Sequence, residues 1–312
     1  MTTIGSSDLD VFPLALGGNT FGWTSDVAES HAVLDAFVDG GGNFVDTADV
    51  YSAWVPGNSG GESEKIIGGW LATRSRDSVL IGTKVSQHPE FSGLSAGNVL
   101  AAADASLARL DTDYIDVYFA HFDDGSSLEE TAGAFDALVR AGKIRAVALS
   151  NYSGARIQEW FSIAQANGFA LPVALQPHYN LVHRGDYEAT IAPVVAQHGL
   201  AVLPYAGLAS GFLTGKYRST ADLTGSPRAG GAEKFLTPDG LALLETLDTI
   251  ARDHETAVAS IALAWLASRA GVVAPIASAR TVQQLPELLA SAAITLTSEQ
   301  VAELDRVSAP IS

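Results

Sequence analysis

The sequence predicts an α/β fold in which eight parallel strands alternate with helices and close into a (β/α)8 TIM barrel. Short apolar runs recur eight times along the chain, and an amphipathic stretch follows each of them. The runs are rich in Val, Ile, Leu and Phe and have no polar face, which is typical of parallel strands buried on both sides. Eight such units in 312 residues favour a barrel over an open sheet. We expect a single domain spanning residues 1–312.

The expected elements follow one another in strict alternation. The strands are predicted at 14–16, 43–45, 79–82, 115–119, 146–149, 173–175, 201–203 and 272–275. The helices between them are predicted at 27–39, 63–73, 95–109, 128–141, 154–167, 187–198, 239–253 and 281–292. A β-hairpin at 4–12 is expected before the barrel. Two further helices, at 257–269 and 298–307, are expected in addition to the eight that alternate with the strands. Ser127 and Ser153 supply oxygen side chains where helices begin, as N-caps do.

Composition narrows the function classes. The chain has 18 Lys and Arg against 35 Asp and Glu, a net charge of −17, which disfavours nucleic acid and anionic membranes as partners. It has no cysteine, so disulfides, thiol nucleophiles and cysteine-based metal sites are excluded. The histidines lack metal-binding spacing, and we expect no metal. No run is long enough to span a membrane and the N-terminus does not resemble a signal peptide, so we expect a cytoplasmic protein.

Polar side chains recur where the predicted strands end. The active sites of TIM barrels lie at the carboxyl ends of their strands. The residues at these ends, in chain order, are Asp46, Tyr51, Lys84, His121, Ser150, Asn151, Gln176 and Tyr205. Any one of them has an ordinary structural explanation, such as a turn cap, a loop aromatic, a surface lysine or a rim histidine. Their recurrence on consecutive strands indicates a site.

The chain resembles the aldo-keto reductase family over nearly its whole length. Eight segments carry the resemblance, and they are specific only together. They are DTADVY (46–51), GESEKIIGGWL (61–71), GTKV (82–85), YIDVYFAH (114–121), KIRAVALSNY (143–152), QPHYNL (176–181), GFLTGKY (211–217) and PIASARTVQQL (275–285).

The resemblance implies a catalytic tetrad and a chemistry that suits it. The tetrad would be Asp46, Tyr51, Lys84 and His121. NADPH would supply a hydride to a carbonyl carbon, and Tyr51 would donate the proton to the oxygen. The ammonium of Lys84 is expected to draw the phenol toward phenolate, with Asp46 holding Lys84 in place. His121 would bind and orient the carbonyl oxygen.

The resemblance also implies the cofactor contacts. Ser150, Asn151 and Gln176 would hold the nicotinamide carboxamide, and Tyr205 would stack on its ring. Arg280, just after the last strand, would bind the adenosine 2′-phosphate, which favours NADP(H) over NAD(H). The remaining contacts are expected from the loops after strands seven and eight. They are Gly207, Leu208, Gly211, Lys216, Ser278 and Gln284.

Some positions depart from the family's pattern. A proline common in the loop after strand seven is replaced by Gly207, and an asparagine common near the adenine is Leu288. The segment 52–60 is longer than the usual linker, and its Trp54, with Trp23, would line the substrate mouth or simply pack. The long glycine-rich segment 206–236 is predicted to close over the pyrophosphate.

These patterns predict a carbonyl reductase that acts on a small aldehyde or ketone with NADP(H). Two alternatives stay open. Lys84 at a strand end is also compatible with a Schiff-base lyase. A regulatory subunit could keep the fold and the cofactor with negligible turnover. The natural substrate, the reaction direction and the oligomeric state stay open as well.

Overall fold

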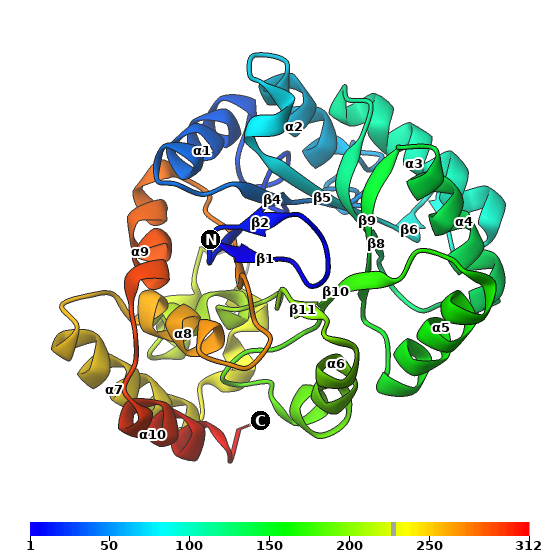
Figure 1. Cartoon of the computed structure of the whole chain (residues 1–312). Helices are drawn as coiled ribbons and strands as arrows, with labels where there is room; N and C mark the ends of the chain where they lie inside the picture. The colour runs from blue at the N-terminus through cyan, green and yellow to red at the C-terminus, as the bar shows by residue number, and fades with distance from the viewer. Residues whose placement is uncertain (226–228, 312) are drawn as a thin grey trace.

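Eight parallel strands form one curved sheet in the computed structural model, which describes residues 1–225 and 229–311 (Figure 1). Their order is β11-β10-β9-β8-β5-β4-β3-β12. The strands are β3 (Ala15–Gly17), β4 (Phe44–Asp46), β5 (Leu80–Val85), β8 (Ile115–Ala120), β9 (Ile144–Ser150), β10 (Pro172–Gln176), β11 (Ala201–Val202) and β12 (Ile276–Ala277). Val202 pairs with Val272, and its N–H donates to the Gly271 carbonyl over 2.8 Å, so the two edges of the sheet meet. The predicted barrel is confirmed.

Helices surround this sheet (Figure 1). They are α1 (Val27–Asp39), α2 (Glu62–Leu71), α3 (Ala96–Leu110), α4 (Leu128–Arg140), α5 (Gly154–Asn167), α6 (Ala192–His198), α7 (Pro238–Asp253), α8 (Val258–Ala267), α9 (Leu285–Ala290) and α10 (Ser298–Ser308). Ser127 and Ser153 cap α4 and α5 as predicted, and both extra helices are present as α8 and α10. Within the described residues, no helix has both the length and the apolar character that crossing a bilayer requires.

Three predicted elements differ from the structure. The last strand was expected at 272–275, which is wrong, because β12 begins only at Ile276. The helix expected at 187–198 starts with a wide π-helical turn, Tyr187–Ile191, just before Pro193, which has no N–H for a regular helical hydrogen bond. The one expected at 281–292 is α9 flanked by short 3-10 turns.

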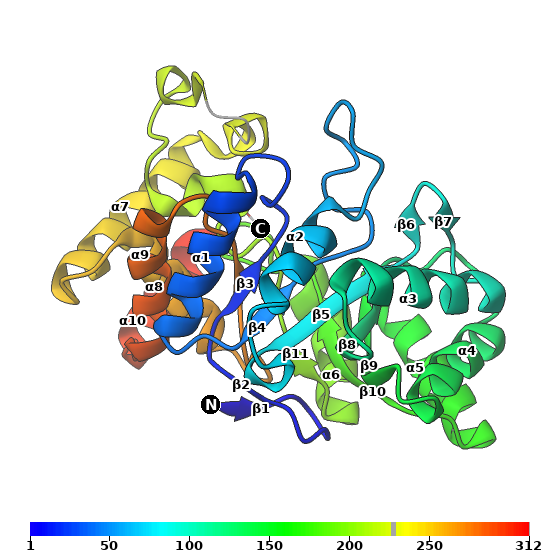
Figure 2. The ribbon, with the colours of Figure 1, turned by 90° about the horizontal axis from the view of Figure 1, so that it is seen from above.

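A β-hairpin closes one end of the barrel. Strands β1 (Thr2–Thr3) and β2 (Asp10–Val11) form the predicted hairpin, although its first strand lies before the expected start at Ile4. Ile4, Leu9 and Val11 are buried against strand residues of the barrel interior. A second, larger core lies between the strands and the helices. Figure 2 shows the hairpin at one end and the loops that follow β4 and β11 rising from the other. Only the carboxyl ends of the strands are therefore left open for a site.

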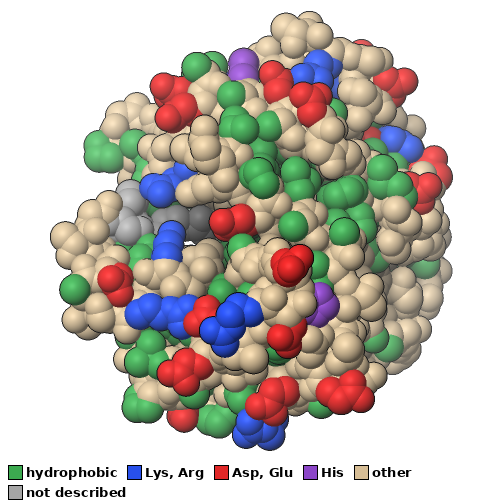
Figure 3. Space-filling model, turned by 90° about the vertical axis from the view of Figure 1, so that its left-hand side faces the viewer, with side chains coloured by type: hydrophobic (Ala, Val, Ile, Leu, Met, Phe, Trp, Pro, Cys, Tyr) green, Lys and Arg blue, Asp and Glu red, His purple; other side chains and the backbone are tan. Residues whose placement is uncertain are grey.

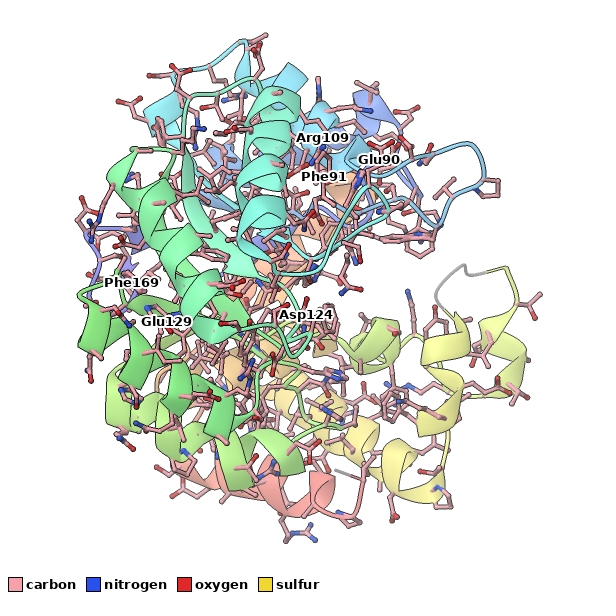
Figure 4. All side chains as sticks on the ribbon, turned by 90° about the vertical axis from the view of Figure 1, so that its right-hand side faces the viewer. Glu90, Phe91, Arg109, Asp124, Glu129 and Phe169 are labelled. Atoms are coloured by element: carbon pink, nitrogen blue, oxygen red, sulfur yellow. The ribbon has the colours of Figure 1, made fainter. Side chains whose placement is uncertain are left out.

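A second antiparallel pair, not predicted from the sequence, extends that open end. Strand β6 (Gln87–His88) pairs with β7 (Phe91–Ser92) directly after β5. In Figure 4, Glu90 and Phe91 at the turn of this pair lie beside Arg109 of α3. Arg109 in turn forms a 2.6 Å ion pair with the buried Glu64 of α2.

Adjacent glycines of α2 provide a matched test of helix packing. A Cβ at Gly68 would lie 2.4 Å from the Arg109 carbonyl oxygen on α3, whereas one at Gly69 would meet nothing nearer than 4.0 Å. Gly68→Ala is expected to lower the free energy of unfolding by about 1–3 kcal/mol through overpacking. Gly69→Ala should raise it by up to about 1 kcal/mol, because alanine favours the helix. Urea unfolding of both variants measures this, and shifts of the same sign would contradict the packing.

Candidate functional site

A buried lysine lies at the centre of the site. The Nζ of Lys84, on β5, donates to Asp46 Oδ2 over 2.8 Å, to the Thr47 carbonyl oxygen over 2.6 Å and to the Tyr51 hydroxyl over 3.2 Å. Lys84 is fully buried and Asp46 nearly so. Strands β4 and β5 are neighbours, and their shared register brings these side chains together. Three tetrad residues predicted from the sequence thus meet at one amine.

The surroundings keep the phenol of Tyr51 protonated. Burial and the negative charge of Asp46 raise its pKa well above the ordinary value of 10.0. Burial lowers the pKa of Lys84, and the contact with Asp46 offsets part of this effect. We expected Lys84 to draw the phenol toward phenolate, but desolvation and Asp46 outweigh the ammonium. The phenol therefore stands ready in its donor form.

His121 completes the group from the end of β8. Its ring centroid lies 6.4 Å from that of Tyr51, and its backbone N–H donates to the Val85 carbonyl oxygen over 3.0 Å. Burial, with the nearby charge of Lys84, holds the pKa of the imidazole well below 6.5. Within the described part of the chain, its Nδ1 makes no hydrogen bond. A neutral imidazole in this place can bind a carbonyl oxygen without carrying a charge.

These pKa directions predict a flat pH profile. His121 stays neutral until the pH falls well below 6.5, and Tyr51 stays protonated until it rises well above 10.0. We expect kcat/KM for carbonyl reduction to show no ionisation of either group between these two values. Rates at saturating cofactor across this range measure it. A limb near neutrality that disappears in His121→Asn would contradict a neutral imidazole.

The predicted carboxamide-binding residues form a hydrogen-bond chain that reaches the tetrad. The Nε2 of Gln176 donates to Asp46 Oδ1 over 2.8 Å, and the Ser150 hydroxyl donates to the Gln176 carbonyl oxygen over 2.9 Å. Asn151 donates to the Ser150 hydroxyl over 3.0 Å and accepts from the Tyr205 hydroxyl over 2.7 Å. The ends of β9, β10 and β11 are thereby tied to the end of β4.

One pocket joins the tetrad to the loops after the last two strands. It has a volume of about 430 Å³. Ten predicted site residues line it, and they are Asp46, Tyr51, Tyr205, Gly207, Leu208, Gly211, Lys216, Ser278, Arg280 and Gln284. The other predicted tetrad and carboxamide residues are connected to this lining by hydrogen bonds or by ring contacts. They are Lys84, His121, Ser150, Asn151 and Gln176. Figure 3, viewed from the side of α7 and α9, shows a hollow with Lys and Arg side chains at its edges.

Two cations line this pocket in an otherwise acidic chain. Lys216 and Arg280 form no ion pair with any described residue, although many arginines elsewhere do. The backbone of Arg280 is fixed, because its N–H donates to Gln284 Oε1 over 2.8 Å and its carbonyl oxygen accepts from Ser25 over 2.9 Å. A pocket lined both by a proton donor and by two cations without an ion-pair partner among the described residues fits an anionic dinucleotide.

The structure adds site residues that sequence reasoning missed. Glu287 lines the pocket beside the predicted adenine end, and Asn19 accepts from Ser278 over 2.7 Å. His178 stacks on Tyr205 at 5.1 Å between centroids and on His183 at 3.8 Å, so three stacked rings include the pocket residue Tyr205. His178 lies within the segment QPHYNL, two residues after Gln176, so its position near the carboxyl ends of the strands could have been predicted from the sequence.

The segment after β11 is packed through its apolar residues. Phe212 and Leu213 are fully buried, and the rings of Phe212 and Phe235 lie 5.3 Å apart. Residues 226–228, which belong to the predicted lid 206–236, lie outside the described residues. This packing anchors the start of the segment, and closure over the pyrophosphate stays a prediction.

Known proteins resemble this chain along its length. The family model described as "Aldo/keto reductase family" matches residues 13–309. A probable voltage-gated potassium channel subunit beta of Oryza sativa is 32% identical over 97% of this chain and 95% of its own length. A norsolorinic acid reductase of Aspergillus flavus is 30% identical over 96% of this chain and 78% of its own. An aryl-alcohol dehydrogenase of Pestalotiopsis microspora is 29% identical, with 96% and 80% covered. The chain belongs to the aldo/keto reductase family.

Proposed function

We propose that this chain is an NADP(H)-dependent oxidoreductase that reduces aldehydes or ketones to alcohols, with residues 1–312 acting as one catalytic domain. The observation that carries the proposal is the pocket itself. It is lined by the proton donor Tyr51 and by Lys216 and Arg280, two cations that form no ion pair with any residue the structure describes. Two relatives bear the names of a reductase and a dehydrogenase, which supports redox chemistry at this site.

The reaction divides between the cofactor and the side chains. When bound, NADPH supplies the hydride that reduces the carbonyl carbon. Tyr51 donates its phenolic proton to the carbonyl oxygen. The ammonium of Lys84, 3.2 Å from that hydroxyl, stabilises the phenolate that remains, and Asp46 holds the ammonium at 2.8 Å. His121, neutral beside Tyr51, orients the carbonyl oxygen.

Binding of the cofactor is assigned to the pocket and to the hydrogen-bond network connected to it. Ser150, Asn151 and Gln176 are proposed to bind the carboxamide, exchanging some of their mutual hydrogen bonds for it. Tyr205 presents a ring to the pocket and is proposed to stack on the nicotinamide. Arg280 is proposed to bind the 2′-phosphate, with Ser278 and Gln284 beside it.

A panel of aldehydes and ketones, assayed with NADPH and with NADH, tests the proposal. We expect carbonyl-dependent oxidation of NADPH, and weaker activity with NADH. Cofactor that binds without being oxidised by any carbonyl would contradict the proposal. That result would favour a second candidate function, a regulatory subunit. The relative named as a probable potassium channel subunit supports this candidate.

The Schiff-base alternative receives no support from the geometry. Lys84 is fully buried, and its amine donates to Asp46, Thr47 and Tyr51 rather than facing open space. An amine engaged in three hydrogen bonds is a poor nucleophile. Borohydride treatment in the presence of a carbonyl substrate should therefore leave no covalent adduct on Lys84.

A further inference from the structure

Three non-glycine residues in the loop after β11 have a left-handed backbone. The φ angles of Ala206, Ala209 and Ser210 are +56°, +46° and +57°. A side chain makes this conformation costly, because its Cβ crowds the neighbouring carbonyl oxygen, and glycine is the usual residue there. Three such residues within five positions store backbone strain, which persists only where the surrounding structure enforces it.

This strained stretch lines the pocket. Every residue from 206 to 211 except Ala209 contributes to the lining, and Ala209 is buried. The strain therefore coincides with the place where the cofactor is proposed to bind. Strained backbone is often found at ligand-binding sites, where it sets a binding conformation in advance.

One side chain from the adjacent loop holds the start of the stretch. The Nδ2 of Asn180 donates to the Ala206 carbonyl oxygen over 2.9 Å, and the N–H of Ala209 donates to the same oxygen over 2.8 Å. Asn180 follows β10, 26 positions earlier in the chain, and is buried. This long-range bond fixes the direction of the Ala206 carbonyl and, with it, the left-handed turn of the backbone.

Asn180 is itself fixed in place. Its Oδ1 accepts from the Val182 N–H over 2.9 Å, so the amide can present only its NH2 group to Ala206. Its backbone exchanges two hydrogen bonds with His183, of 3.2 and 3.0 Å. A donor anchored on both its backbone and its side chain loses little further conformational entropy when it holds the loop.

We propose that Asn180 is a positioning residue that sets the pocket-lining backbone 206–211 in its binding conformation before NADP(H) arrives. This inference rests on the proposed cofactor. A loop that is already ordered loses less conformational entropy on binding, so the affinity for the cofactor is higher. The left-handed backbone of Ala206 opposes this order, and the hydrogen bond from Asn180 offsets it. Without that bond, Ala206 returns to an ordinary negative φ and the pocket lining turns away.

A stability measurement tests the strain without any ligand. Glycine adopts a positive φ freely, so Ala206→Gly should raise the urea midpoint of unfolding, the reverse of the usual effect of this change. Ala101→Gly, at an exposed position of α3, is the matched control and should lower the midpoint, because glycine disfavours a helix. A lower midpoint in both variants would show that Ala206 is not strained and would overturn the inference.

Binding of NADPH, followed by its fluorescence, tests the hydrogen bond. Asn180→Ala should raise the Kd about two- to tenfold, the range for one neutral hydrogen bond. Adding Ala206→Gly to this variant should bring the Kd back toward the unaltered value, because glycine adopts the left-handed conformation without the bond. Adding Ala209→Gly instead should not, since the released carbonyl belongs to Ala206. Asn98→Ala is the matched control. Asn98 likewise donates to two backbone carbonyl oxygens, in and just after β7, and its loss should leave the Kd unchanged.

The outcomes separate this inference from the proposed function. An unchanged Kd in Asn180→Ala overturns the inference, and so does a loss that Ala206→Gly fails to reverse, because Asn180 then acts by another route. NADPH binding that follows the expected pattern, without oxidation by any carbonyl, overturns the reductase and leaves the role of Asn180 intact. Absence of NADPH binding by the unaltered protein overturns both.

Discussion

Replacing Tyr51 with phenylalanine is expected to lower kcat/KM for carbonyl reduction by roughly a hundredfold or more, the usual loss when a positioned acid is removed. The phenol is held protonated by burial and by Asp46, which raise its pKa, and Lys84 lies 3.2 Å from its oxygen. Phenylalanine keeps the ring contacts with Trp54 and His121 and loses the hydroxyl group, which donates the proton and accepts a hydrogen bond from Lys84. Steady-state rates with NADPH and an aldehyde measure the effect.

Cofactor binding should survive in this variant. The proposed carboxamide contacts come from β9 and β10, and the cations come from the loops beyond β11 and β12. The Kd of NADPH, measured by its fluorescence on binding, is therefore expected to stay within about threefold. Tyr114→Phe is a matched control, because Tyr114 precedes β8 at the closed end of the barrel. Near-normal turnover by Tyr51→Phe would show that another group supplies the proton.

The site residues at the carboxyl ends of the strands could be predicted from the sequence, because the barrel fold places all of these ends at one opening. Parallel strands buried on both faces read as apolar runs, and their carboxyl ends share one edge of the barrel. Asp46, Lys84 and Gln176 each follow or end such a run, and the structure joins them by hydrogen bonds of 2.8 Å. Helices with strong caps were also predictable, and α1 and α5 match the expected residues.

Other features depend on tertiary contacts that no local pattern carries. Strand β12 is only two residues long, and it lies after the apolar run 272–275 that was expected to form the last strand. Val272, in that run, instead pairs with Val202 where the two edges of the sheet meet. The pKa of Tyr51 depends on how completely the fold desolvates it, which the residue types do not reveal. The contacts of Trp54 with Trp23 and Tyr51, at 5.6 and 6.2 Å between ring centroids, likewise appear only in three dimensions.

Removing the guanidinium of Arg280 is expected to change which cofactor the protein prefers. Arg280 lines the pocket and forms no ion pair with any described residue, so its charge is available to a phosphate. Arg280→Ala should weaken NADPH binding by about 1.5–3 kcal/mol, roughly 10- to 150-fold in Kd, the range for hydrogen bonds to charged groups. NADH lacks the 2′-phosphate, so its Kd should change little.

The backbone contacts of Arg280 make this a clean substitution. Its N–H and carbonyl oxygen are held by Gln284 and Ser25, and alanine keeps both bonds. Arg252→Ala removes an exposed arginine of α7 whose guanidinium donates to Thr249 of the same helix, and it controls for the loss of one positive charge. Calorimetric titration of all three proteins with both cofactors gives the comparison. If Arg280→Ala weakens NADPH and NADH equally, the guanidinium acts on a part common to both cofactors, and the preference for NADP(H) must come from elsewhere in the pocket.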